Sequence, residues 1–540
     1  MCFGRRFAMG FALFLLGVTA AFRPGVASAT PIWSTDQDIT DGDVNDTFTS
    51  NNGQHFMAVD DSNNLYVAFF DNRFKVTNGD NNFEIFFRRF IFNFGSPYIT
   101  RVTNAPNMSK FPAIAIRNWG AGDYDTQRDS GRVYIAWQDA RLFSIPAAGE
   151  PKSYTIFMRT FRSMGGTAFG PELQVSPYDS INPATLPVVT VGDSNRVWIA
   201  WQKPDAVSGN SAIFSTTYHS DTGAIDSIIQ QTPGFFFGGN ASIAASRDGV
   251  VHLVWVDTRS GSQQIWTKRF VPGSGWTADE EVVFSSVSAS APSINADYNN
   301  HMHLVWEDRR NGSSDIYYKE YVPGVGWDPT DTQVTFNTSS QIQPYVDADP
   351  RGNVYAVWTD LRNGSNNPDI YYDTRQNGSW VGNMSLVGAG TDTTNSVQRF
   401  PGIVHDDFGT AYVAWSDERF PASIGKNKEV FYKVGTDVVT AVSTEQRPAL
   451  SRLLRNYPNP FNPVTTIQFV VNRDSQVSLR VFDVQGRAVR TLLNSYLAAG
   501  SRVVGWDGKD DGGRSMASGT YFLRLQGGGT FLTRTINLVR

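Results

Sequence analysis

Six pairs of charged residues recur along the chain in the same setting. A large aromatic residue is followed two positions later by an aspartate and four positions later by an arginine. The pairs are Asp71 and Arg73, Asp139 and Arg141, Asp257 and Arg259, Asp308 and Arg310, Asp360 and Arg362, and Asp417 and Arg419. A carboxylate beside a guanidinium could transfer protons or hold an anionic ligand. Because an active site in a repeated structure breaks the repeat, six copies favour a structural role in turns or between repeats.

The six histidines form no metal-binding or catalytic pattern. His252 and His303 lie three residues before the aromatic, where other copies have Tyr or Trp, which predicts buried positions. The others have no metal-ligand spacing; they are His55, His219, His301 and His405. No serine, histidine and aspartate set and no phosphate-binding glycine loop stands out. We therefore predict no catalytic residue, no metal ligand and no cofactor, and leave the binding residues unknown.

An acidic run near the start of the chain has the oxygen ligands that Ca²⁺ prefers. It contains Asp36, Asp38, Asp41, Asp43 and Asp46. The run lacks the EF-hand spacing with a central glycine and a distal glutamate, so a solvated loop is the expectation.

The charged pairs belong to a repeat with seven aromatic anchors spaced 51 to 68 residues apart. The anchors are Phe69, Trp137, Trp201, Trp255, Trp306, Trp358 and Trp415. The third copy departs from the pattern, with Lys203 and Asp205 in the charged positions. Each unit reads as four strands in which apolar and polar residues alternate. Residues 292–297 are an example of the first strand, the second strand carries the anchor, and residues 83–90 and 332–336 are examples of the third and fourth strands.

A repeated four-stranded unit of about 50 residues is typical of a β-propeller. Seven anchors predict an all-β fold with a seven-bladed propeller over residues 30–440, in which each sheet covers its neighbour. The segment 32–40 contains DQDIT, which is similar to the fourth-strand sequence DTQVT. We expect it to complete the last sheet and close the ring. The alternative closing strand is Val438–Val442.

The repeat resembles the sialidase-like propeller superfamily through a degenerate Asp-box. Ser163, Gly166 and Phe169 keep parts of that motif without its aspartate, and three tryptophans occupy the same place in later copies; these are Trp276, Trp327 and Trp380. The resemblance implies the fold and raises the alternative of a secreted glycoside hydrolase.

Sialidases bind the substrate carboxylate with three arginines, one in an Arg-Ile-Pro motif, and use a Tyr–Glu pair and an aspartate. The closest match is Arg399-Phe400-Pro401. Its proline is a repeat feature, however, found again as Pro112, Pro187, Pro292 and Pro344. We therefore do not expect Arg399 to be a catalytic-site arginine.

The first 29 residues read as a secretory signal peptide. Arg5 and Arg6 precede the apolar run Phe7–Phe22, and Ala27-Ser28-Ala29 is a cleavage site. Cleavage removes three arginines, no acid and the only cysteine, Cys2, which lowers the net charge from −5 to −8. That charge argues against nucleic acid as a partner. No later segment has the length of a membrane span.

After a polar linker at residues 441–455, residues 456–540 read as short strands separated by Asp-Gly and Gly-Gly turns, which predicts an Ig-like sandwich. The segment resembles the type A sorting domain of the type IX secretion system, related to the Ig-like flagellar hook-capping family. The motif residues are Tyr457, Pro458, Asn459, Pro460, Phe461, Asn462, Pro463, Gly486, Arg487, Trp506, Asp507, Gly508, Ser518, Gly519 and Tyr521. The resemblance implies a Gram-negative-type bacterium, export through the periplasm, and an outer-membrane translocon as partner. The alternative is an ordinary accessory Ig domain.

Two functions follow from these features. The favoured one is a secreted or cell-surface propeller that binds a glycan or a surface protein without catalysis. The alternative is a sialidase-like hydrolase, with a site built by three irregular segments. These segments are Arg117–Gly131, Leu142–Lys152 and the phenylalanine-rich Phe235–Gly239.

Overall fold

The computed structural model describes residues 31–40, 47–49, 55–60, 64–73, 82–90, 99–116, 132–143, 151–162, 169–192, 196–285, 287–386, 396–406, 409–419, 428–437, 450–457, 459–471, 475–497, 500–527 and 530–540. Within these ranges all the named elements are β-strands. The described residues contain no helix that is long and apolar enough to cross a membrane. The protein forms two compact units, residues 29–438 and residues 439–540. The predicted signal peptide lies outside the described residues.

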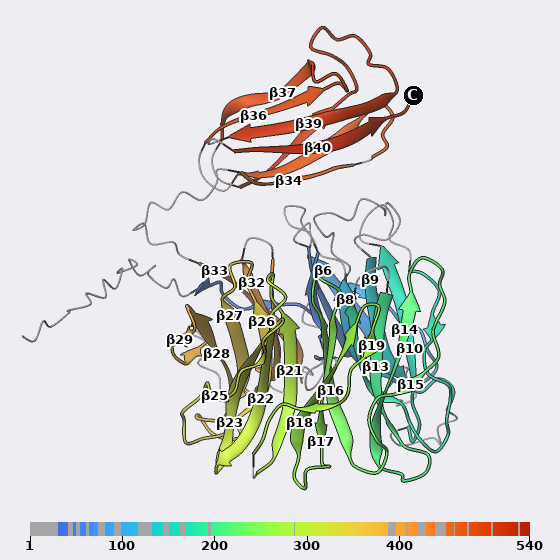
Figure 1. Cartoon of the computed structure of the whole chain (residues 1–540), viewed down its shortest axis with the longest axis vertical. Helices are drawn as coiled ribbons and strands as arrows, with labels where there is room; N and C mark the ends of the chain where they lie inside the picture. Colours follow the sequence, from blue (N-terminus) through green and yellow to red (C-terminus); the bar gives the residue numbers. More distant parts are fainter. Residues whose placement is uncertain are drawn as a thin grey trace, which may run out of the picture. The chain divides into compact units, whose positions relative to one another are not determined.

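The first unit consists of seven antiparallel sheets among the described residues (Figure 1). The first strands are β4 (Met57–Val59), β8 (Ser109–Ile116), β12 (Thr185–Val191), β16 (Gly238–Ala245), β21 (Ala289–Ala296), β26 (Gln341–Ala348) and β31 (Gln398–His405). The second strands are β5 (Leu65–Asp71), β9 (Arg132–Asp139), β13 (Arg196–Pro204), β17 (Val251–Asp257), β22 (Met302–Asn311), β27 (Val354–Asp360) and β32 (Ala411–Asp417). The short strand β3 (Thr47–Phe48) pairs with β5 as well.

The outer half of each sheet is a long third strand and a short, often interrupted fourth strand. The third strands are β6 (Glu84–Phe90), β10 (Thr155–Arg162), β14 (Ser211–His219), β18 (Gln264–Val271), β23 (Ser313–Val322), β28 (Asp369–Gln376) and β33 (Glu429–Asp437). The fourth strands are β7 (Ile99–Arg101), β11 (Leu173–Gln174), β15 (Ile229–Gln230), β19 and β20 (Gly275–Trp276, Glu280–Glu281), β24 and β25 (Gly326–Trp327, Thr332–Gln333), and β29 and β30 (Ser379–Trp380, Met384–Ser385).

The last sheet takes its fourth strand from the beginning of the ring. β1 (Pro31–Trp33) and β2 (Gln37–Asp38) both pair with β33, so the predicted closure by the N-terminal segment is confirmed. The alternative segment, Val438–Val442, lies outside the described residues. Contacts between the first strands run in a closed cycle from β4 through β8, β12, β16, β21, β26 and β31 back to β4. The first strands therefore surround the axis of a ring, and the predicted all-β propeller is confirmed.

The aromatic anchors fill the space between neighbouring sheets. All seven are buried, with at most 1 % of the side chain exposed. Burying a tryptophan contributes on the order of 4 kcal/mol as an upper estimate. The recurrence of this residue follows from the same packing problem at every interface.

The first strands share a β-bulge that explains the repeated proline. Six of them shift register at the same place, next to a residue with a positive φ between 48° and 58°. These residues are Phe111, Leu186, Asn240, Ala291, Gln343 and Phe400, and all but Asn240 precede a proline. Proline has no N–H to donate, so within a sheet it fits best at a bulge.

The C-terminal unit is an Ig-like sandwich of two sheets. One contains β34 (Leu450–Tyr457), β35 (Thr465–Val471) and β38 (Gly500–Trp506). The other has the order β37 (Ala488–Leu497), β36 (Ser475–Phe482), β39 (Gly519–Gly527) and β40 (Thr530–Leu538). Their inner faces enclose a separate core that includes Phe469, Leu479, Trp506 and Leu523.

The linker predicted at residues 441–455 is corrected at its end. Strand β34 begins at Leu450 and pairs with β35. Two register irregularities, between Leu450 and Arg452 and between Leu453 and Asn456, interrupt the alternation of sides. The segment therefore lacks the period of two by which a strand is recognised in sequence.

Candidate functional site

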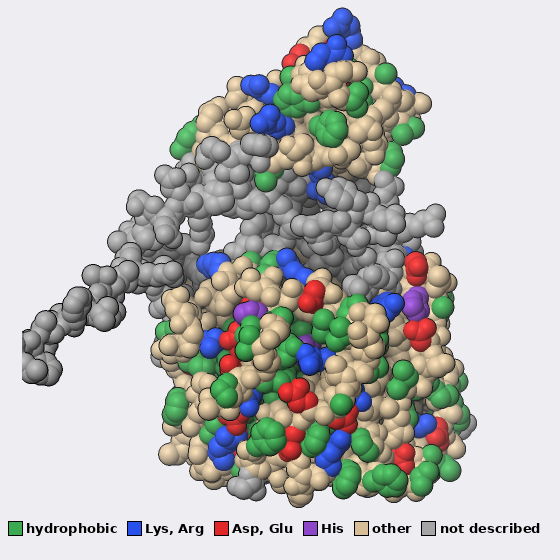
Figure 2. Space-filling model, viewed as in Figure 1, with side chains coloured by type: hydrophobic (Ala, Val, Ile, Leu, Met, Phe, Trp, Pro, Cys, Tyr) green, Lys and Arg blue, Asp and Glu red, His purple; other side chains and the backbone are tan. Residues whose placement is uncertain are grey.

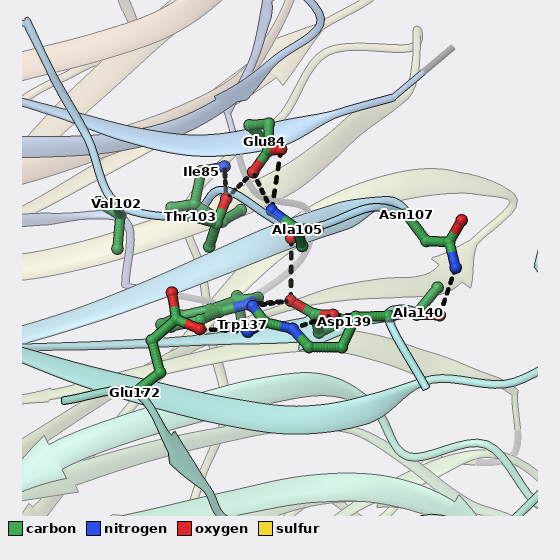
Figure 3. Close-up of polar contacts among 12 residues, drawn as sticks. Glu84, Ile85, Val102, Thr103, Ala105, Asn107, Trp137, Asp139, Ala140 and Glu172 are labelled. Atoms are coloured by element: carbon green, nitrogen blue, oxygen red, sulfur yellow. Dashed lines mark hydrogen bonds and ion pairs between the residues drawn. The ribbon is translucent and has the colours of Figure 1, made fainter. Parts of the chain in front are cut away.

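The repeated aspartate and arginine form a structural unit inside each sheet. In the second sheet, Trp137 Nε1 donates a hydrogen bond of 2.8 Å to Asp139, and the backbone N–H and side chain of Arg141 donate to the same carboxylate (Figure 3). The guanidinium lies over the ring of Phe157, 4.4 Å from its centroid. The same tryptophan to aspartate bond recurs at Asp257, Asp308, Asp360 and Asp417. The predicted structural role of these pairs is therefore confirmed.

The same arginines also join the third and fourth strands. Arg141 contacts Glu172 (Figure 3), Arg259 lies 2.7 Å from Asp279, and Arg310 lies 2.8 Å from Asp331. In the last sheet, Arg419 contacts Asp36 of the N-terminal segment at 2.7 Å. Asp36 is thereby a structural ion-pair partner, while the rest of the acidic run from Asp41 lies outside the described residues.

A cation on the third strand reaches back to a carbonyl of the preceding sheet. Lys268 donates to Gln231, Lys319 to Val282 and Lys433 to Leu386, at 2.8 to 2.9 Å. Arg159 and Arg88 do the same toward Val102 and Ile39. These five contacts therefore join neighbouring sheets around the ring.

The residue three positions before each anchor is also part of the scaffold. His252 and His303 are 1 % and 2 % exposed, so the predicted buried positions are confirmed. Nδ1 of His303 lies 2.9 Å from the Tyr318 hydroxyl. In two other sheets, Tyr66 and Tyr412 donate to a turn aspartate at 3.1 Å.

The symmetry of the ring breaks at the first strands. In each sheet, one first-strand residue pairs with the residue three positions before the anchor, as Ala58 pairs with Tyr66. This first-strand residue is small or apolar in four sheets and is Thr190 in a fifth. In the two remaining sheets it is Asn295 and Asp347. One position further along, His405 replaces the Val, Ile or Ala of the other six sheets.

These three residues form one hydrogen-bonded set across three neighbouring sheets. Asp347 accepts from Asn295 Nδ2 at 2.6 Å, and from the backbone N and Nδ1 of His405 at 2.7 and 2.9 Å. An ionised carboxylate only accepts hydrogen bonds, so Nδ1 of His405 donates to it and Nε2 is left as the other ring nitrogen. That Nε2 is buried with no hydrogen-bond partner among the described residues. We call Asn295, Asp347 and His405 the axis triad.

A second pair crosses the ring beside the axis triad. The Tyr345 hydroxyl shares a hydrogen bond of 2.6 Å with Nδ1 of His55, although the two residues belong to different sheets. Burial raises the pKa of Tyr345 well above its usual value, and Asp347 adds to that increase. Burial lowers the pKa of His55 to about 4, so its imidazole is neutral near pH 7.

The axis triad offers hydrogen-bond acceptors rather than the two carboxylates of a glycosidase. Asp347 keeps 11 % of its side chain exposed, and Asn295 is partly exposed. Among the described residues no lysine or arginine forms an ion pair with Asp347, and no group of three or more His, Asp or Glu is placed to hold a metal ion. Most glycosidases place two carboxyl groups on either side of the scissile bond, whereas sialidases use a tyrosine as the nucleophile. The triad has one, oriented by an amide and an imidazole, which suits binding of a hydrogen-bond donor.

Glu307 carries another carboxyl group that is not repeated in the other sheets. It lies near the starts of the first strands, whereas the axis triad lies near their ends. Glu307 follows its anchor directly and accepts a 2.7 Å hydrogen bond from the backbone N of Gln343, at the bulge of the next sheet. Burial raises the pKa of Glu307. Gln138 and Gln202 accept from the bulges of Leu186 and Asn240 in the same way. Glu307 therefore belongs to a set of contacts between sheets.

The other predicted features do not converge. Arg399 donates to the carbonyl of Ser365 at 3.3 Å. Arg117–Gly131 and most of Leu142–Lys152 lie outside the described residues. Phe235 and Phe236 are 77 % and 42 % exposed, before the start of a first strand and thus away from the axis triad. Figure 2 shows such hydrophobic side chains scattered among charged ones.

Two histidines without a predicted role are satisfied locally. His219 lies 3.0 Å from Asp226, and His301 lies 2.7 Å from Glu320.

Most motif residues of the C-terminal unit build its core and turns. Trp506 is buried, packs 5.3 Å from the rings of Phe461 and Tyr521, and donates to the carbonyl of Lys509. Gly508 and Gly486 have positive φ values. Three more motif side chains accept hydrogen bonds from backbone N–H groups. Asn459 accepts from Asn537, Ser518 from Arg540, and Asp507 from Lys509. Tyr457 ends β34, Pro460, Asn462 and Pro463 lie between β34 and β35, Gly519 begins β39, and Pro458 lies outside the described residues.

Acid should destabilise the propeller through buried neutral histidines. Burial, with a contribution from Arg269, lowers the pKa of His252 to about 3, whereas the unfolded value is about 6.5. The unfolded chain therefore binds more protons, and stability falls as the pH drops below 6.5. We expect His252 to contribute a loss of about 2–3 kcal/mol at pH 4.5 relative to pH 7.5. Urea unfolding at the two pH values measures it.

The repeat itself supplies the variant that tests this loss. Tyrosine occupies the same position in four sheets, so His252→Tyr should fold. We expect it to reduce the loss of stability at pH 4.5 by about 2–3 kcal/mol, whereas the surface change His219→Gln should not alter that loss. An identical pH dependence in His252→Tyr and the parent would contradict the assignment.

Comparisons with known proteins match one family model to the C-terminal unit. The family model for the FlgD Ig-like domain matches residues 463–529, and no curated protein matches the chain. Similar solved structures include PorZ of Porphyromonas gingivalis, an essential bacterial surface component of its type-IX secretion system, at 12 % identity and a TM-score of 0.39. The match covers 90 % of this chain and 60 % of PorZ, so the chain spans less than two thirds of PorZ.

Two enzymes are also among the similar structures. The Trypanosoma rangeli sialidase is 10 % identical with a TM-score of 0.38, over 82 % of this chain and 86 % of the sialidase. A fungal alcohol oxidase in complex with copper is 10 % identical with a TM-score of 0.46, over 94 % of this chain and its whole length.

Proposed function

We propose that this chain is a secreted or cell-surface bacterial protein whose propeller binds a glycan or a surface protein without catalysis. The observation that carries the proposal is the axis triad, the non-repeated polar set of Asn295, Asp347 and His405. The repeated charges are occupied by the scaffold, and the triad presents the partly exposed carboxylate of Asp347 and amide of Asn295. This is a set that can accept hydrogen bonds from hydroxyl or amide groups of a ligand.

The proposed export route has two steps. Residues 1–29 act as a signal peptide for passage to the periplasm. Residues 456–540 then act as a type A sorting domain for an outer-membrane translocon, with residues 30–440 as the cargo propeller. The FlgD Ig-like match at residues 463–529 supports this assignment.

Asp347→Asn should abolish or weaken ligand binding at least tenfold while the protein remains folded. The change keeps the shape but removes the charge that orients His405 and strengthens hydrogen bonds from a ligand. The measurement is binding of the full secreted chain to a glycan array and to intact bacterial surfaces, followed by titration of each ligand found.

The matched control is Thr190→Val, at the equivalent position of another sheet. It should leave binding unchanged. Equal binding by the parent and Asp347→Asn would refute the assigned site, and hydrolysis of a fluorogenic sialoside panel by the parent would refute a non-catalytic role.

A further inference from the structure

A groove lies on the outer face of the four-stranded sheet in the C-terminal unit. It has a volume of 260 Å³. Phe482, Phe522 and Arg524 alternate along their strands with core residues such as Val481 and Leu523, so they point away from the sandwich core. The complete lining is Phe482, Asp483, Val484, Gly486, Phe522, Arg524 and Thr533.

The motif Phe482 to Arg487 forms one end of this groove. Asp483 accepts hydrogen bonds from the backbone N of Gln485 and Arg487 and from Arg487 Nε, at 2.8 to 3.0 Å. Its carboxylate is therefore used inside the turn. Val484, at the tip, is 63 % exposed. The turn thus presents an apolar rim, and its charges balance each other.

Two arginines stand side by side next to the two phenylalanines. Arg480 on β36 and Arg524 on β39 are direct cross-strand partners in the register, and both are exposed. Like charges directly opposite each other destabilise a sheet. The next pair in the register is Phe482 and Phe522. The outer face therefore joins a doubly positive position to an aromatic floor.

The net charge of residues 456–540 has the same sign. Residues 456–540 contain ten Lys and Arg against five Asp and no Glu, a net charge of +5, although the complete chain has −5. An acidic partner is attracted to such a surface.

We propose that this groove binds an extended acidic segment of a partner protein, with one large apolar side chain against Phe482 and Phe522 and carboxylates on Arg480 and Arg524. The volume supports a side chain as occupant, because a cavity of about 150 Å³ already holds benzene. The inference deepens the proposed export role, since the partner would be a component of the secretion machinery.

The test is fluorescence anisotropy with the full chain and a labelled peptide of one phenylalanine between two runs of four glutamates. We expect saturable binding that weakens at least tenfold with Arg524→Glu, with Val484→Asp, and with a peptide in which glycine replaces the phenylalanine. The matched control is Arg514→Glu, an equally charged change on an exposed turn of the same unit outside the groove. It should alter the affinity less than twofold.

Three results would overturn the inference: no binding of the acidic peptide, equal binding of a peptide with glutamine for glutamate, or equal losses in Arg524→Glu and Arg514→Glu. Circular dichroism of each variant separates loss of binding from loss of folding.

Secretion in a bacterium with a type IX system separates this inference from the export role. If a chain ending at residue 440 is retained but Arg524→Glu is secreted normally, the groove is not the recognition surface and the export role stands. If the shortened chain is secreted as well, the export role falls, and with it the groove's assignment to the secretion machinery.

Discussion

A chain that begins at residue 41 should lose the cooperative unfolding of the propeller. The missing segment supplies β1 and β2, the buried Ile39, and Asp36, which pairs with both Arg419 and Lys433. Lys433 is 4 % exposed, so its charge would stay buried without its carboxylate. Removing one partner of a buried pair alone costs about 3–5 kcal/mol, a large share of the 5–15 kcal/mol that stabilises a typical domain.

Scanning calorimetry of the shortened and the complete propeller measures this effect. We expect a fall of the main transition by more than about 10 °C and aggregation, because β33 would expose a long unpaired edge. A synthetic peptide of residues 31–40 added in excess should restore part of the stability. An unchanged transition temperature would show that closure by this segment contributes nothing.

Asp360→Ala should destabilise the propeller by about 3–5 kcal/mol, since it leaves buried donors without their acceptor. The Asp360 side chain is 0 % exposed and accepts from Trp358 Nε1, from the backbone N of Arg362 and from two guanidinium nitrogens, at 2.6 to 3.0 Å. Urea unfolding monitored by tryptophan fluorescence gives the difference.

The chain offers a matched control in its own exception to the repeat. Asp205 occupies the corresponding region of the third sheet, but it is only half-buried and accepts from a turn and from Gln230. Asp205→Ala should cost much less than Asp360→Ala. Similar losses in the two variants would mean that the tryptophan, aspartate and arginine set does not stabilise the sheets.

The elements predicted from the sequence are those fixed by a repeated packing need. The anchor tryptophans and the aspartate two residues later occur in phase with the second strands, so their burial and pairing could be inferred without coordinates. The closing segment could be predicted because DQDIT keeps the fourth-strand pattern, and Asp38 does lie in β2.

The axis triad escaped prediction because it is defined only by the register. Asn295, Asp347 and His405 lie on first strands, where a bulge interrupts the alternation that sequence comparison relies on. Asp347 stands where three other sheets have alanine, but its contacts with Asn295 and His405 join three sheets and follow only from the arrangement of the ring. The start of β34 was missed for the same reason, because two irregularities hide its period.

Ring closure has a kinetic consequence. Val434 N donates to Ser34 Oγ across 400 positions of the chain, so the final sheet has a very high contact order. The entropy of closing so long a loop must be overcome before these contacts stabilise anything. Assembly of the last sheet should therefore be the slow step, and a newly made chain would remain vulnerable to aggregation and proteolysis until these two distant segments meet.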